Sequence, residues 1–115
     1  MKPKFTTIHF PVFCNYTVHI ELAEDIHTAM RKYPTTRNIS TEDVEAITVH
    51  KDDASFSFVF FKPNANAGTI AHESYHIVRR ILKYMGCDVD NEVVAYHLGY
   101  LVNAITNFIR KGQRR

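Results

Sequence analysis

The chain has 115 residues, of which 45% are hydrophobic and 23% charged, and its formal net charge is +2. This length suits one domain with a hydrophobic core, and no stretch approaches the roughly 18 apolar residues that a membrane-spanning helix needs. With no secretory signal and only two cysteines, Cys14 and Cys87, the sequence favours a reducing, cytoplasmic location over a disulfide-rich secreted fold.

The first third of the chain predicts a β-hairpin followed by a helix. Residues 5–13 and 16–22 alternate apolar and polar side chains, with a short turn at Cys14-Asn15 between them. Pro11 has no backbone N–H to donate, so we expect the first strand to be an edge strand or bulged there.

A helix over residues 23–33 follows and ends at Pro34. The polar stretch 35–43 predicts a loop. Residues 44–50 predict a strand, and 55–63, the most apolar run of the chain, predicts a central or well-covered strand.

Two long helices are predicted in the second half. The first runs from Ile70 to about Met85, with Thr69 as its N-cap and Gly86 as its C-terminal cap. Its apolar side chains form one arc, while histidine, arginine and lysine side chains lie opposite: His72, His76, Arg79, Arg80 and Lys83.

The second helix covers about 91–109, and a flexible basic tail is expected at 111–115. The pattern as a whole predicts an α+β fold, a small antiparallel sheet followed by two long helices, in one domain over residues 1–115. The basic tail fits a helix C-terminus better than a nucleic-acid surface, which would need a basic face along a folded element.

The first long helix carries the pattern His72-Glu73-Ser74-Tyr75-His76. Two histidines four residues apart project from one face of a helix, so both imidazoles can reach one tetrahedral zinc ion. Glu73 lies beside His72, where its carboxylate can act on a water molecule at that ion. The alternative is that the histidines are ordinary solvated residues of the polar helix face.

A catalytic zinc site needs a third protein ligand, and the candidates after His76 are Cys87, Asp88, Asp90 and Glu92. Asp88 and Asp90 also suit an N-cap, and a cysteine is often simply an apolar side chain. Glu92 is favoured because it lies in the first turn of a helix, although the helix dipole alone could account for an acidic residue there.

These residues support a resemblance. The segment Gly-Thr-Ile-Ala-His72-Glu73-Ser-Tyr-His76, followed by Asp-Asn-Glu92-Val-Val-Ala-Tyr96-His-Leu-Gly-Tyr100-Leu, resembles the zincin-like metallopeptidases, in particular small phage-type proteins of that kind. The resemblance covers residues 67–103. It implies a minimal zincin-like fold, with His72, His76 and Glu92 as zinc ligands and Glu73 as the catalytic residue.

The expected function is therefore zinc-dependent hydrolysis of a protein or peptide bond, with Glu73 activating a zinc-bound water. An oxyanion donor is also needed, and the candidates from the sequence are Tyr75, Tyr96, Tyr100 and His97. The alternative functions are a catalytically weak or inactive scaffold that binds a regulatory or host protein and, with less support, nucleic-acid association through the basic helix face and tail.

Overall fold

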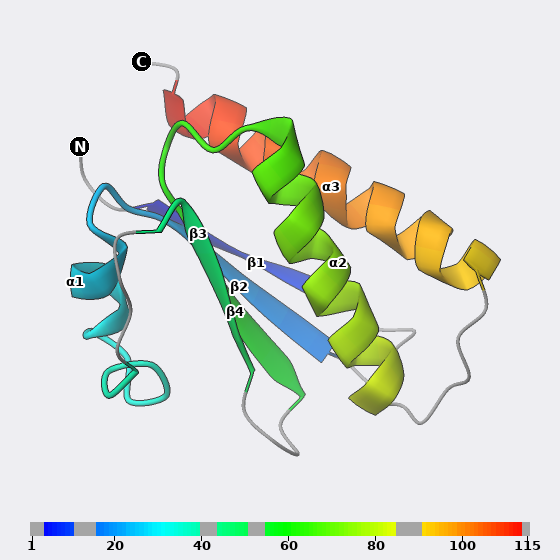
Figure 1. Cartoon of the computed structure of the whole chain (residues 1–115), viewed down its shortest axis with the longest axis horizontal. Helices are drawn as coiled ribbons and strands as arrows, with labels where there is room; N and C mark the ends of the chain where they lie inside the picture. The colour runs from blue at the N-terminus through cyan, green and yellow to red at the C-terminus, as the bar shows by residue number, and fades with distance from the viewer. Residues whose placement is uncertain (1–3, 11–15, 40–43, 51–54, 85–90, 114–115) are drawn as a thin grey trace.

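The computed structural model of the chain describes residues 4–10, 16–39, 44–50, 55–84 and 91–113 (Figure 1). Its elements follow in chain order: β1 (Lys4–Phe10), β2 (Tyr16–Leu22), α1 (Ile26–Met30), β3 (Ala46–His50), β4 (Phe56–Phe61), α2 (Ala67–Tyr84) and α3 (Asn91–Gln113). The α+β class, with two long helices after the sheet, is confirmed.

The four strands form one mixed sheet in the order β1-β2-β4-β3. The hairpin prediction is correct, since β1 and β2 pair antiparallel with Phe10 opposite Tyr16, and β1 lies at an edge of the sheet. The expectation of an entirely antiparallel sheet needs correction, because β4 enters between β2 and β3 and runs parallel to β2. Pro11 and the turn at 14–15 lie outside the described residues.

Strand alternation gives the sheet two different faces. Side chains at every second position of the strands pack beneath α2 and α3, which lie side by side over that face (Figure 1). The fully buried members of this core include Tyr16, Val18, Ile20, Leu22, Val59, Phe61, Ile77, Ile81, Leu101 and Ile105. The opposite face carries Phe58 and Phe60 and is covered in part by α1 and the chain after it.

α1 is shorter than the sequence predicted. Asp25 caps it by accepting a hydrogen bond from the Thr28 backbone N–H, and the regular helix ends at Met30. The following turns place the Tyr33 hydroxyl on Glu21, a fully buried carboxylate of β2 that Lys32 also contacts at 2.8 Å. Burial and the Glu21 carboxylate raise the pKa of Tyr33. These tertiary contacts, which periodicity does not encode, redirect the chain after one helical turn.

The ends of α2 and α3 also differ from expectation. α2 begins at Ala67, and the Asn66 side chain accepts a hydrogen bond from the Thr69 backbone N–H at 2.8 Å, so Asn66 occupies the capping role assigned to Thr69. The prediction for Met85 and Gly86 lies outside the described residues. α3 continues past Ile109 to Gln113, so the first part of the predicted basic tail is helical.

Neither helix is long and apolar enough to cross a membrane, as judged over the described ranges.

We expect Phe61→Ala to lower the free energy of unfolding by about 3–5 kcal/mol, because this fully buried ring of the central strand would leave a cavity beneath the helices. Phe5→Ala is the matched control, since the Phe5 ring is 66% exposed on the edge strand, and its expected effect is within about 0.5 kcal/mol. Urea unfolding of both variants measures the difference. Equal losses would contradict the assigned core.

Candidate metal centre

α2 presents its two motif histidines together on an exposed face. The helix packs its apolar side onto the sheet, which leaves the His72 and His76 side chains in solvent one helical turn apart. Their Nε2 atoms lie 3.1 Å apart. Two imidazole nitrogens on one tetrahedral zinc, each at about 2.0–2.1 Å from the ion, are separated by roughly 3.3 Å. The distance between the two nitrogens is therefore close to that of two positions in a zinc coordination shell, and it is also the distance of a hydrogen bond between the two rings.

Glu73 occupies a different environment from the histidine pair. It is only 8% exposed, and its Oε1 atom accepts a hydrogen bond of 2.5 Å from the Thr48 hydroxyl on β3. Its other oxygen, Oε2, lies 3.9 Å from His72 Nε2. Thr48 thus fixes one carboxylate oxygen and leaves the other 3.9 Å from His72, where it could accept a proton from a water molecule on an ion held by the histidines.

A pocket of about 450 Å³ opens next to these groups. It lies between the beginning of β3 and the first turns of α2, and its lining includes Ala46, Gly68, His72 and Glu73. A ligand in this pocket would therefore contact both a histidine of the pair and the carboxylate.

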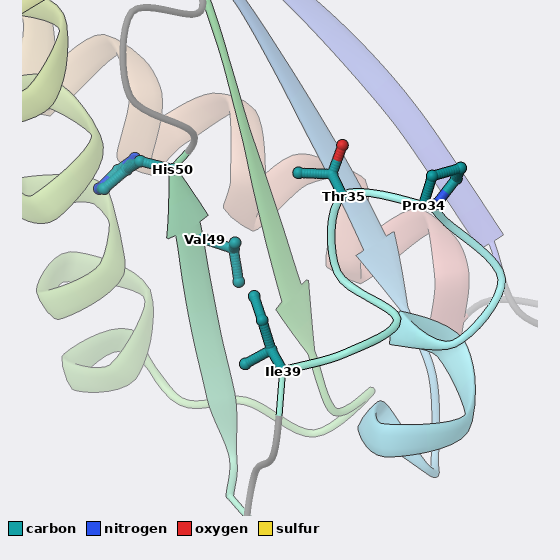
Figure 2. Close-up of a pocket in the computed structure, with 5 residues that line it drawn as sticks. All are labelled: Pro34, Thr35, Ile39, Val49 and His50. Carbon is teal, nitrogen blue, oxygen red and sulfur yellow. The ribbon is translucent and has the colours of Figure 1, made fainter.

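His50, at the end of β3, lies on the same face of the sheet as Thr48. Figure 2 shows its ring turned toward α2, away from Pro34, Thr35 and Ile39. Its Nδ1 atom is 2.9 Å from the hydroxyl of Ser57, the residue opposite it on β4. Burial, together with the nearby charges of Arg80 and His76, lowers the pKa of His50 to about 4, so the imidazole is neutral at pH 7.

The third ligand predicted from the sequence is placed only in part. Glu92 belongs to the first turn of α3, but its side chain lies outside the described residues, as do Cys87, Asp88 and Asp90. His76 lies near the middle of α2, about two turns or roughly 12 Å before the C-terminal end of that helix. Within the described parts of the chain, no three His, Cys, Asp or Glu side chains form a cluster that could hold a metal ion. Glu92 stays a prediction.

The candidate oxyanion donors from the sequence do not gather at the site. Tyr96 is 76% exposed, and Tyr75 and Tyr100 are also exposed. The Tyr100 ring contacts Phe10 of β1 edge to face. His97 lies within hydrogen-bonding distance of the Val93 carbonyl of its own helix, 2.8 Å from Nδ1. The contacts that Tyr100 and His97 make here are therefore with Phe10 and Val93 and not with His72 or His76.

The predicted basic face of α2 is also narrower than the sequence suggested. Arg79 and Lys83 are exposed, but Arg80 is half-buried and hydrogen-bonds to the Tyr16 hydroxyl. Two of the three basic side chains on this part of α2 are therefore exposed to solvent, and the third points into the protein.

Thr48 and His50 are the residues that sequence reasoning missed. A signal was present, because Ala46, Thr48 and His50 alternate along one strand and so share one face of the sheet. The sequence does not show which helix covers that face, since α2 meets β3 only through the tertiary fold.

Comparisons with known proteins gave no match: none was found among protein-family models, curated proteins or solved structures.

Proposed function

We propose that this chain is a zinc-dependent peptidase whose reaction centre is formed by His72, His76 and Glu73. The observation that carries the proposal is the spacing of the two Nε2 atoms, 3.1 Å, next to a buried carboxylate with one oxygen 3.9 Å from His72 Nε2. His72 and His76 would hold the ion, with Glu92 as the predicted third ligand.

A zinc ion held there would polarise a substrate carbonyl and lower the pKa of a water molecule. Glu73 accepts a proton from that water, whose oxygen forms a bond to the carbonyl carbon of the peptide. The C–N bond then breaks, and Glu73 delivers the proton to the leaving nitrogen. Thr48 keeps the carboxylate oriented through both proton transfers.

The neighbouring sheet edge supports a peptide as the substrate. β3 is the outer strand of the sheet and contacts α2, and no strand of the described residues pairs with its outer side (Figure 1). An extended peptide could hydrogen-bond along such an edge. Pockets lie at both ends of β3, one lined by Ala46 and Glu73 and the other by Val49 and His50 (Figure 2). These are positions where substrate side chains would fit.

The second candidate function is a non-enzymatic scaffold that binds a regulatory or host protein. The observation that favours it is the group of large side chains left exposed on the two long helices, which includes Tyr75, Tyr96 and Tyr100. Tyrosine side chains are enriched in protein interfaces, where they contribute apolar area and one hydrogen bond.

Metal content and hydrolysis test the proposed function directly. We expect purified protein, after exposure to zinc and dialysis, to retain about one zinc per chain by mass spectrometry of the metal. The loaded protein should release fluorescent peptides from labelled casein, and a chelator should stop the release. Protein that retains no zinc would overturn the proposal. Zinc retention without cleavage of casein or of a peptide library would favour the scaffold.

A further inference from the structure

A chain of hydrogen bonds runs from the protein core to His50, whose ring is turned toward α2. The Tyr16 and Ser57 hydroxyl oxygens are 2.6 Å apart, and both residues are fully buried. Ser57 Oγ lies 2.9 Å from His50 Nδ1. At the other end, Arg80 hydrogen-bonds to the Tyr16 hydroxyl. The order is therefore Arg80, Tyr16, Ser57, His50. The ring of His50 is turned toward α2 (Figure 2), and the charge of His76 on that helix contributes to its lowered pKa.

The chemistry of these groups fixes the direction of the hydrogen bonds. A guanidinium only donates, so Tyr16 accepts from Arg80 and must give its own proton to another acceptor. The acceptor that its contacts provide is Ser57 Oγ. Ser57 then donates its proton to His50 Nδ1. In the reverse direction, the Tyr16 proton would be buried without an acceptor, which costs about 1–3 kcal/mol.

We infer that His50 is held as the neutral tautomer with its proton on Nε2, and that this N–H is the hydrogen-bond donor for the carbonyl oxygen of the peptide substrate. This inference rests on the proposed function for the identity of the acceptor. The tautomer itself follows from contacts within this chain. A donor fixed before the substrate arrives needs no reorganisation as negative charge develops on the oxygen.

The same direction of hydrogen bonding argues against His50 as the third zinc ligand. A histidine that binds zinc through Nε2 carries its proton on Nδ1 and donates it to an acceptor. Here Nδ1 meets a hydroxyl whose proton is already directed at it. Consistently, His50, His72 and His76 do not form a three-residue metal cluster among the described residues.

Nitrogen-15 NMR of the histidine rings in metal-free protein tests the tautomer without reference to activity. The ring signals of His50 are assigned by their loss in His50→Gln. We expect a protonated Nε2 and an unprotonated Nδ1, and the same pattern after zinc is added, while the signals of His72 and His76 move. A proton on Nδ1, or zinc coordination at His50 Nε2, would overturn the inference.

Tyr16→Phe tests whether the hydrogen-bond chain sets the tautomer. It keeps the aromatic ring but removes the proton that directs Ser57, so a fraction of His50 should now carry its proton on Nδ1. If the tautomer of His50 did not change in Tyr16→Phe, the chain of hydrogen bonds would not be what determines it.

The role toward substrate is tested with zinc-loaded His50→Ala and labelled casein, because alanine, unlike glutamine, has no side-chain N–H donor. We expect kcat to fall by about 10²-fold with KM and zinc content close to wild type, because a transition-state donor is lost and no ligand is removed. His27→Ala, the same change at an exposed histidine on α1, should match wild type in all three. Unchanged kcat in His50→Ala would remove the catalytic role. Absence of zinc or cleavage in wild type would instead count against the proposed function, and the NMR result would still decide the tautomer.

Discussion

Glu73→Gln should abolish peptide hydrolysis while the protein keeps its zinc. An amide cannot accept the proton of the attacking water at neutral pH, yet its size and its hydrogen bond from Thr48 are preserved. Loss of general-base catalysis typically costs about 10²–10⁴-fold in rate. Because Glu73 is buried and not one of the predicted zinc ligands, the variant should still fold and bind one zinc per chain.

The matched control is Glu24→Gln, which makes the same chemical change at an exposed position before α1. Its hydrolysis and zinc content should equal those of wild type. The same pair of variants separates the two candidate functions. If Glu73→Gln retains the full biological effect of wild type, the chain acts by binding, and the catalytic assignment of Glu73 is wrong.

The order and type of the main elements were predictable because their patterns are local. Alternation identified β1 and β2, and the dense apolar run identified β4 as an inner strand. The parallel pairing of β2 with β4 was not predictable in this way. It depends on the connection through α1 and β3, which places β3 outside β4 and is a property of the whole chain.

The candidate site likewise combines features that local spacing predicts with features that depend on the tertiary fold. The spacing of His72 and His76 determined that they share a helix face, and the structure brings their Nε2 atoms within 3.1 Å. Spacing also predicted that Glu73 lies next to His72. It did not predict that Glu73 is buried or that it accepts a hydrogen bond from Thr48. His50 comes from a strand more than twenty residues earlier in the chain, and its approach to α2 depends on how that helix packs across the sheet. Helical and strand periodicity do not determine which distant segments of the chain come into contact.

His72→Ala and His76→Ala should each eliminate stable zinc binding, the largest effect expected on the metal. Each substitution removes one of two nitrogens that lie 3.1 Å apart, and a remaining imidazole with one carboxylate provides too few ligands for a closed site. We expect zinc affinity, measured by competition with a chelating dye, to fall by at least about 10²-fold. Hydrolysis should disappear with it.

Folding should be little affected in these variants, which makes the metal result interpretable. The His72 side chain is 68% exposed and His76 is also exposed, so each alanine removes little buried area, and metal-free unfolding should stay within about 0.5 kcal/mol of wild type. His27→Ala provides a histidine control on the other face of the sheet. Zinc binding that survives in both His72→Ala and His76→Ala would place the metal elsewhere, and zinc lost equally in His27→Ala would indicate nonspecific binding. Only selective loss at positions 72 and 76 agrees with a centre built on α2, because only there do two imidazoles of the described chain face each other across one helical turn.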